Sequence, residues 1–459
     1  MNSNIMKEAN SKLSMTNQRK ILLENHSYLR TVVVASNAIQ SGTSTGGIMH
    51  SLLGSWPRDK LVQIVTPFLE SGTPDFDSCK DYYIIPPVGG VKKINSSASQ
   101  LRKSSYARLP AWGKRIKPWF PYLKILFSPL REYLCSRSAY ISKLENSLRC
   151  LRPEIVYALV GNYFLAKAVT LACKKARVPL YLHIVDDYVT SLYDGEFSQN
   201  YLKKMSVYWL KEAIEYATGH AAIGPHMAQE YQRRYGCDWS WFTTLCQASD
   251  YDPLPYFHHP KEPIKFVFAG NITLGRWHLL QKLGNSLSKL AKEGIYGCLT
   301  IYTSPASIEV YGRKLENFPI VNLQPWVPVS DLPNIFHKAD VLVHVESFGA
   351  DYVKYTKWSL SSKISQYMMA GRPILAFGEP SLASIRLVGE HDTGFVLGSF
   401  EERSIKSVLK DLIKNHEKRI ALGENGRCFA MKAFDFESRR ENFRQELLKA
   451  YNNWHDRQA

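Results

Sequence analysis

The sequence predicts an α/β protein with two doubly wound, mostly parallel sheets that form two domains facing each other across a cleft. Three observations predict this class. The chain has 459 residues, which is too long for one hydrophobic core and suits two domains of about 200 residues each. Short apolar runs alternate with helical patterns along most of the chain, as in successive βαβ units. A proline-rich break near the middle separates two such series.

The first series of strands follows a polar N-terminal stretch. Residues 1–30 are rich in Asn, Ser and Lys, show no apolar period and lack the apolar core of a signal peptide, so we expect a flexible tail. Continuous apolar runs are typical of parallel strands covered on both faces. Six such runs predict strands at 31–36, 61–66, 82–85, 155–160, 180–185 and 220–223. Residues 31–250 are therefore expected to form the N-terminal domain.

The second series begins after a linker. Residues 251–263 contain Pro253, Pro255, Pro260 and Pro263. Strands are then predicted at 265–270, 298–303, 341–345 and 373–377, within a C-terminal domain at 264–433. In the last segment, 434–459, Asp435 can cap a helix whose apolar residues share one face. This helix is expected to cross the seam between the domains.

Composition limits the class of protein. The eight cysteines are scattered and form no C-x-x-C pair, which indicates reduced thiols in a cytoplasmic protein. No stretch approaches the roughly 18 apolar residues of a membrane span. The net charge of +17 favours a partner with negative charge: nucleic acid, an anionic membrane surface or a phosphate-bearing substrate.

Much of this charge lies between residues 101 and 143, where ten Lys and Arg residues face one acid, Glu132, and alternate with aromatic residues. Such a mixture favours contact with the headgroups of an anionic membrane, on the inner face of which the protein would be peripheral. A solvated loop that packs on its own domain is the alternative. Nucleic-acid binding is disfavoured because no nucleic-acid module is recognisable.

The strongest local signal for a site is the stretch from Ser361 to Ala376, SSKISQYMMAGRPILA. Ser361 or Ser362 can begin a short helix, and Gly371 can end it before the next strand. The free N–H groups of the first turn, together with Lys363, would form an anion site suited to a diphosphate. An ordinary capped surface helix is the alternative.

Three further signals follow predicted strands. A glycine-rich turn ends in Gly46-Gly47 before a helix at 48–56 and could approach a phosphate, although it is not G-x-G-x-x-G and could be a simple turn. Asn271 and Arg276 lie in the turn AGNITLGRW, from which Arg276 could reach the same diphosphate. The adjacent carboxylates Asp186 and Asp187 end a strand where a cleft is expected, with helix capping or a salt bridge as the alternative.

With these stretches, the chain resembles glycosyltransferase family 4, of GT-B fold with two Rossmann-like domains, and within it the type that builds bacterial surface polysaccharides. The resemblance covers residues from about 31 to 450 and rests on LHIVDDYVTSLY (182–193), IGPHMAQEYQRRYG (223–236), FAGNITLGRWHL (268–279) and the stretch 361–376. It implies that the C-terminal domain binds a nucleotide sugar and the N-terminal domain an acceptor. Ser362, Lys363 and Arg276 would hold the diphosphate, with a backbone contact from Gly47, and Asp186 or Asp187 would lie near the sugar or acceptor.

The chain departs from this family at two positions. Many members carry two glutamates eight positions apart, whereas this sequence has Trp358 and Gln366 there. Gln366 can still bind ribose hydroxyls as a neutral group. Glu346 is then a candidate for contact with the sugar. Asp75-Phe-Asp77 matches the D-x-D letters of metal-dependent transferases but follows a polar turn instead of a strand.

The sequence therefore predicts transfer of a sugar from a nucleoside-diphosphate sugar to an acceptor hydroxyl, with a lipid-linked or polysaccharide acceptor and no metal or other cofactor. The resemblance to the family implies retention of configuration. Cationic groups fixed at the leaving diphosphate would stabilise the charge that develops there. A sugar-nucleotide epimerase of the same fold and a non-catalytic partner subunit are the alternatives.

Overall fold

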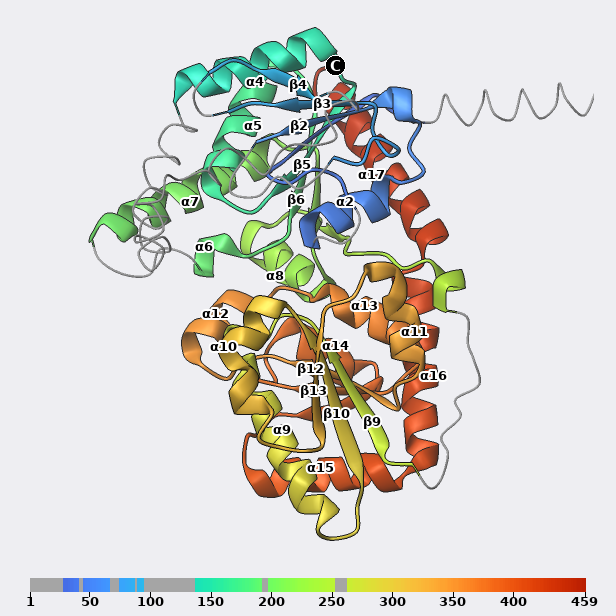
Figure 1. The fold of residues 1–459 in the computed structure, drawn as a ribbon. Coiled ribbons are helices and arrows are strands. Elements are labelled where there is room, and N and C mark those ends of the chain that lie inside the picture. Colours follow the sequence, from blue (N-terminus) through green and yellow to red (C-terminus); the bar gives the residue numbers. More distant parts are fainter. Residues whose placement is uncertain are drawn as a thin grey trace, which may run out of the picture.

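The computed structural model describes residues 28–40, 44–66, 74–86, 89–94, 137–191, 197–251 and 262–459. They form two α/β domains, stacked one above the other in Figure 1. We call the part up to residue 251 the N-terminal domain and the part from residue 262 the C-terminal domain. Most of the expected tail, of the basic segment and of the linker lies outside the described residues.

The N-terminal domain contains an eight-stranded sheet in the order β4-β3-β2-β1-β5-β6-β7-β8. All neighbouring strands in it are parallel except the pair β3 and β4, which is antiparallel. The strands are β1 (Thr31–Ala35), β2 (Leu61–Val65), β3 (Asp81–Ile84), β4 (Lys92–Ile94), β5 (Ile155–Val160), β6 (Leu180–Ile184), β7 (Gly219–Ala222) and β8 (Ser240–Trp241).

Helices cover this sheet. They are α2 (Ser44–Leu53), α4 (Ser138–Leu151), α5 (Tyr163–Ala176), α6 (Tyr188–Ser191), α7 (Phe197–Tyr216) and α8 (Pro225–Tyr235). Helix α5 packs between α4 and α7. Helix α2 begins four residues earlier than the sequence predicts and ends at Leu53, so that Gly47 lies inside the helix. The residues from Ser44 to Gly46, which precede Gly47, are thus already part of the helix and do not form an open turn.

The C-terminal domain contains a six-stranded parallel sheet in the order β11-β10-β9-β12-β13-β14. The strands are β9 (Ile264–Ala269), β10 (Gly297–Thr303), β11 (Val321–Pro325), β12 (Val341–Val345), β13 (Ile374–Phe377) and β14 (Gly394–Leu397). Strands β10 and β11 follow β9 on one side, and β12 to β14 follow on the other. The point where the strand order reverses therefore lies between β9 and β12.

Two groups of helices enclose this second sheet, and each group packs on one of its faces. One face is covered by α9 (Arg276–Ala291), α10 (Pro305–Leu315) and α15 (Glu402–Lys414). The other is covered by α11 (Leu332–His337), α13 (Ser362–Met369), α14 (Ala383–Glu390) and α16 (His416–Ala433). Helix α12 (Ala350–Thr356) packs against α6 of the N-terminal domain.

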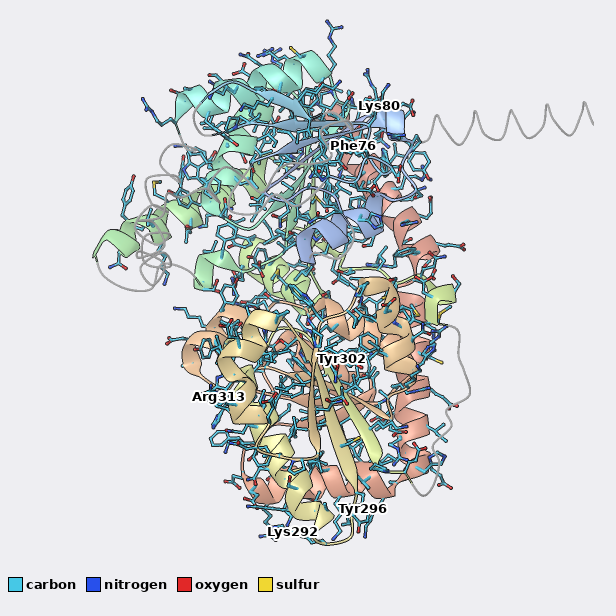
Figure 2. All side chains as sticks on the ribbon, in the orientation of Figure 1. Phe76, Lys80, Lys292, Tyr296, Tyr302 and Arg313 are labelled. Atoms are coloured by element: carbon cyan, nitrogen blue, oxygen red, sulfur yellow. The ribbon has the colours of Figure 1, made fainter. Side chains whose placement is uncertain are left out.

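The carboxyl ends of the second sheet point toward the N-terminal domain. Figure 2 shows Lys292 and Tyr296, just before β10, at the end of the domain remote from the junction, and Tyr302, near the end of β10, closer to it. The loops that follow these parallel strands are therefore placed at the junction of the domains.

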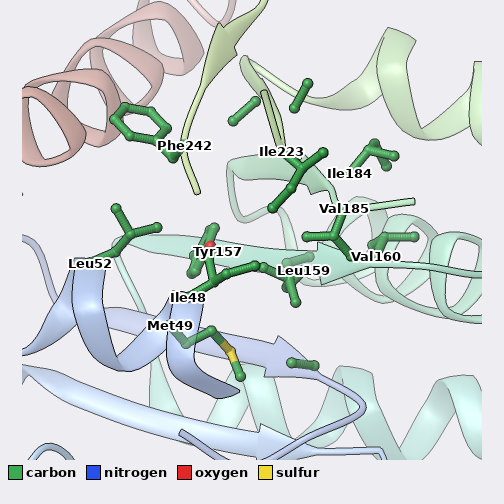
Figure 3. Close-up of a cluster of buried hydrophobic side chains, with 14 of the residues drawn as sticks. Ile48, Met49, Leu52, Tyr157, Leu159, Val160, Ile184, Val185, Ile223 and Phe242 are labelled. Carbon is green, nitrogen blue, oxygen red and sulfur yellow. The ribbon is translucent and has the colours of Figure 1, made fainter. Parts of the chain in front are cut away.

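The hydrophobic core of the N-terminal domain continues into the C-terminal domain. Figure 3 shows Ile48, Met49 and Leu52 of α2 next to Tyr157 and Leu159 of β5. The same cluster of buried side chains extends to Leu360 and α13, whereas a separate cluster fills the α9 face of the second sheet. One face of the C-terminal sheet thus shares its core with the N-terminal domain.

The last helix, α17 (Phe436–Asp456), returns to the N-terminal domain and packs against α2, β6 and β7. The Asp435 side chain accepts hydrogen bonds from the backbone N–H groups of Glu437 and Ser438, as its N-cap position predicts. Phe443 is fully buried there and meets the ring of Tyr157 edge-on at 5.1 Å. No helix in the described parts of the chain is long and apolar enough to span a membrane.

Candidate functional site

Four side chains gather where the strand order of the C-terminal sheet reverses. Arg276 begins α9 after the loop that follows β9, Glu346 follows β12, and Lys363 lies in the first turn of α13. The fourth, His344, lies on β12 itself. Doubly wound sheets bind their ligands at such a reversal point, because the loops diverge there to opposite faces.

Lys363 lies directly over Gly270. A Cβ atom at residue 270 would be 2.3 Å from Cε and 2.9 Å from Nζ of Lys363, so glycine is the residue that lets this side chain cross the end of β9. No hydrogen bond or ion pair joins Nζ to any group within the described ranges. Lys363 therefore presents an ammonium group that is held in place by packing and still has its hydrogen-bonding capacity.

Arg276 is fixed by Glu346. Glu346 Oε2 accepts hydrogen bonds from Nη2 and Nε of Arg276 at 2.8 and 3.2 Å. Gly275, which precedes the helix, has a left-handed φ of 77°, and a Cβ there would lie 2.9 Å from Ser347 Oγ. The close approach of two loops thus sets the direction in which the Arg276 side chain leaves the helix. Asn271 acts within its own loop, since its Oδ1 accepts the backbone N–H of Thr273 at 2.9 Å.

Burial and neighbouring charges shift the pKa values of the groups in this cluster. Burial lowers the pKa of Lys363, and the nearby Arg276 guanidinium lowers it further. Burial raises the pKa of Glu346, although Arg276 opposes the shift. Burial and the two cations lower the pKa of His344 to about 3. His344 is therefore neutral at physiological pH, and its buried Nε2 lies 3.6 Å from Glu346 Oε1.

The first turn of α13 adds backbone donors to the site. Ser361 is the N-cap, but its side chain makes no capping hydrogen bond, and its own N–H donates to Ser384 Oγ at 2.9 Å. Ser362 opens the helix, and both serines are half-buried. Gln366, one turn further on, is also half-buried, and its side-chain amide has no partner among the residues described. The helix end, Lys363 and Arg276 together can hold a dianion such as a diphosphate.

The adjacent carboxylates Asp186 and Asp187 have different surroundings. Asp187 is buried and accepts hydrogen bonds from Thr190 Oγ1 at 2.6 Å, Tyr231 OH at 2.9 Å and Arg234 Nη1 at 3.0 Å. All three partners belong to the N-terminal domain. This agrees with the salt-bridge alternative for Asp187, whose two carboxylate oxygens both accept hydrogen bonds from side chains of its own domain.

Asp186 points to the C-terminal domain instead. Its Oδ1 accepts a hydrogen bond from Ser359 Oγ at 3.1 Å. Burial raises its pKa, and the neighbouring Asp187 carboxylate raises it further, whereas the Ser359 hydroxyl lowers it. The pKa of Tyr355, on α12, is raised first by Asp186 and is lowered by Arg276. The Tyr355 phenol is therefore within electrostatic range of both the Asp186 carboxylate and the Arg276 guanidinium.

Sequence reasoning missed Tyr355, Ser359 and His344 as members of this site. His344 could have been found from its place two residues before Glu346 at the end of a strand. Tyr355 and Ser359 carry no motif, because their positions matter only through the opposite domain.

Two further sequence signals do not join the cluster. No described atom lies within 4 Å of the position that a Cβ on Gly47 would occupy, and no contact links Gly47 to Arg276 or Lys363. Asp75 of the D-x-D letters is used by its own turn, accepting the N–H of Asp77 and the hydroxyl of Ser78. Across the described ranges, no three His, Cys, Asp or Glu residues form a group that could hold a metal ion.

Comparison with known proteins identifies the fold. No protein-family model matches the sequence, and no curated protein matches it. Among solved structures, HepE from Anabaena in complex with UDP and glucose superposes with a TM-score of 0.58 at 12% identity, over 92% of this chain and 99% of that chain. Sucrose-phosphate synthase from Thermosynechococcus elongatus gives 0.58 at 12%, over 90% and 97%.

A third structure is similar to the same extent. Trehalose 6-phosphate synthase from Burkholderia multivorans gives a TM-score of 0.56 at 11% identity, over 94% of this chain and 99% of that chain. The structures that this chain resembles are GT-B glycosyltransferases, and the superposition covers nearly the whole length of both partners. The predicted GT-B fold, with two α/β domains on parallel sheets, is confirmed.

Proposed function

We propose that this chain is a glycosyltransferase that takes its sugar from a nucleoside-diphosphate sugar bound by the C-terminal domain. The observation that carries the proposal is the cationic pair at the reversal point of the second sheet: Lys363 packed over Gly270 and Arg276 oriented by Glu346. Two cations and a helix N-terminus meet here, and Glu346 offsets their charge only in part, since burial and Arg276 still lower the pKa of Lys363. The GT-B fold and a structural neighbour bound to UDP and glucose support the same ligand class.

The proposed chemistry follows from the position of these charges. Cleavage of the glycosidic bond leaves negative charge on the departing diphosphate. Lys363, Arg276 and the N–H groups of α13 would stabilise this charge more strongly in the transition state than in the bound substrate, since it grows as the bond breaks. Gln366 would bind ribose hydroxyls through its amide, and Glu346 would contact the sugar while holding Arg276.

Asp186 is proposed to act at the sugar or acceptor. It comes from the N-terminal domain, accepts a hydrogen bond from Ser359 of the C-terminal domain, and raises the pKa of Tyr355 on α12, which Arg276 lowers. The buried hydrogen bonds of Asp187 would hold the backbone at this position and so help to orient the neighbouring Asp186 side chain.

The finer assignments rest on the sequence resemblance. They are family 4, a lipid-linked or polysaccharide acceptor in surface-glycan synthesis, retention of configuration, and catalysis without a metal. Gly47 is proposed to supply a backbone contact to the donor from the N-terminal domain. Peripheral attachment to the inner face of the membrane rests on the composition of residues 101–143, of which only Arg137 to Lys143, at the start of α4, lie within the described chain.

Binding of nucleoside diphosphates tests the donor site. The full chain would be titrated calorimetrically with UDP, GDP, dTDP and, for comparison, CMP and NAD. One nucleoside diphosphate should bind, and Lys363→Ala should weaken it about 10- to 100-fold because a charge-assisted contact to phosphate is lost.

Lys289→Ala is the matched control, since Lys289 lies on α9 of the same domain and pairs with Glu402 on the surface. It should bind like the wild type. If no nucleoside diphosphate binds the wild type, the proposed donor site is wrong.

Turnover separates the proposal from its alternatives. Incubated with the matching nucleotide sugar alone, a transferase slowly releases free sugar and nucleoside diphosphate. An epimerase would instead convert the sugar while leaving it attached, and a non-catalytic subunit would bind the nucleotide without either product.

A further inference from the structure

The segment of residues 357–361 joins α12 to α13, and its side chains contact the N-terminal domain. We call it the connecting segment. It lies in the C-terminal domain by sequence, and its last residue, Ser361, is the N-cap of α13. Three consecutive residues in it, Trp358, Ser359 and Leu360, each contact a different part of the N-terminal domain.

The first contact is between Trp358 and Arg234 of α8. The guanidinium carbon of Arg234 lies 5.9 Å from the centroid of the Trp358 ring, within the range of a cation–π interaction. Arg234 is itself held by Asp187 at 3.0 Å and by Glu230 at 2.7 Å. The Trp358 ring therefore rests on a cation whose position the N-terminal domain fixes with two carboxylates.

The second and third contacts follow directly. Ser359 Oγ donates to Asp186 Oδ1 at 3.1 Å. Leu360 is buried, and its Cβ would be 3.0 Å from a Cβ placed on Gly224, the residue before α8. A larger residue at 224 would push the connecting segment away, so the two domains approach closely at this point.

Within the C-terminal domain, the connecting segment is held through its backbone. The backbone N–H of Ala383 donates to the carbonyl oxygen of Lys357 at 2.9 Å. The Ser384 hydroxyl donates to the carbonyl oxygen of Ser359 and accepts a hydrogen bond from the backbone N–H of Ser361. These bonds fix the backbone to α14. The side chains of residues 358–360, in contrast, are directed to the other domain.

We infer that Trp358 and Ser359 are positioning residues through which the N-terminal domain sets the anion-binding end of α13. The inference rests on the proposed function, since it assigns the control of the same donor site. It also gives a role to Trp358, which joins the two domains through its contact with Arg234. Neither residue is proposed to touch the donor.

Linkage makes the inference testable in both directions. If contact with the N-terminal domain favours the binding-competent form of α13, binding of a nucleoside diphosphate must strengthen that contact by the same factor. Couplings of this kind change affinity by about 5- to 150-fold.

The experiment measures nucleoside-diphosphate affinity by calorimetry in the full chain, with the nucleotide that the wild type binds. Trp358→Ala and Ser359→Ala should each weaken binding by about 5-fold or more, while Trp358→Phe and Ser359→Thr, which keep the ring and the hydroxyl, should restore most of it. Trp326→Ala removes an exposed tryptophan of the same domain, and Ser330→Ala removes a serine that donates to Asp331 at 3.1 Å. Both are matched controls and should bind like the wild type.

Hydrogen exchange supplies a readout that a purely local role would not change. The nucleotide should slow amide exchange in α8 of the N-terminal domain in the wild type, and this protection should be lost in Trp358→Ala. Unchanged affinity in both alanine variants, or equal protection of α8 with and without Trp358, would overturn the inference. A wild type that binds no nucleoside diphosphate would instead overturn the proposed function.

Discussion

Two adjacent carboxylates at the end of β6 show how neighbouring residues acquire different roles. The chain turns into α6 directly after them, so Asp187 points back into the N-terminal domain while Asp186 points to Ser359. Asp187 completes a buried network with Tyr231 and Arg234. Removing its charge would leave Arg234 less well paired, whereas within the described residues the Asp186 side chain accepts one hydrogen bond, from Ser359.

The two residues should therefore respond differently to the same substitution. Asp187→Asn is expected to lower the free energy of unfolding by about 3 kcal/mol, because it breaks a buried charge pair. Asp186→Asn should change stability little but reduce turnover of the nucleotide sugar strongly. Chemical denaturation and an activity assay on both variants check this. Equal losses of stability would show that Asp186 is also structural.

The pH dependence of turnover should report on Asp186. Burial and Asp187 raise the pKa of its carboxyl, and the Ser359 hydroxyl lowers it by donating to the charged form. The groups that interact with it are the Asp187 carboxylate, the Ser359 hydroxyl and, electrostatically, the Tyr355 phenol. If the carboxylate is the working form, activity is present above this pKa and is lost as the pH falls through it.

Removing the Ser359 hydroxyl should then raise the pKa of Asp186, so the acid limb of the rate profile should move to higher pH in Ser359→Ala. Ser359→Thr, which keeps the hydroxyl, should keep the wild-type limb. An acid limb that stays in place in Ser359→Ala would argue against Asp186 as the group that titrates.

The sequence could predict the part of the site that follows from local rules. A serine pair before a lysine at a helix start, and an arginine after a glycine turn, indicate a candidate anion site because each group acts from its own backbone position. Asp187 looked equally suitable as a catalytic group, because its burial depends on α8, which lies 38 residues or more further along the chain. Ser359 and Tyr355 depend on the approach of the other domain, which no local pattern encodes.

At the scale of elements, the ten strands predicted from apolar runs correspond to strands of the two sheets. The four that sequence reasoning missed, β4, β8, β11 and β14, are the outermost strands of those sheets. An outer strand is covered by fewer neighbours, and these four contain exposed or half-buried residues in place of a continuous apolar run. The rule that found the inner strands therefore cannot find the outer ones.

Helix α17 should matter more to stability than its position at the end of the chain suggests. Phe443 is fully buried and meets the rings of Tyr157, Tyr181 and Phe242 at centroid distances of 5.1, 5.9 and 5.1 Å. Phe443→Ala is expected to cost about 3–5 kcal/mol, because it leaves a cavity among rigid rings. Phe400→Ala, at a phenylalanine that is 54% exposed, is the control and should cost much less. Chemical denaturation of both variants measures the difference, and equal costs would show that α17 is only loosely attached.

At the scale of the molecule, three features couple the two domains in addition to the contacts of Trp358 and Ser359. A single cluster of buried apolar residues runs from the first sheet to Leu360 and α13. The chain also returns to the N-terminal domain, where backbone hydrogen bonds join Cys246 to Phe434 and Phe436. His226 of α8 is hydrogen-bonded to Glu390 of α14 at 2.7 Å. Unfolding of one domain would thus expose apolar surface and polar groups on the other.

We therefore expect the two domains to melt together, in one calorimetric transition whose measured enthalpy equals the van't Hoff enthalpy. Because ligand binding stabilises whatever unit unfolds cooperatively, a nucleoside diphosphate bound to the C-terminal domain should move the whole transition upward. At 100 times its dissociation constant it adds about 2.7 kcal/mol to that unit. The double variant Trp358→Ala/Leu360→Ala weakens the junction and should broaden or split the transition, after which the nucleotide should move only the part that belongs to the C-terminal domain. Two resolved transitions in the wild type, with only one of them moved by the nucleotide, would show that the shared core does not make the domains one cooperative unit.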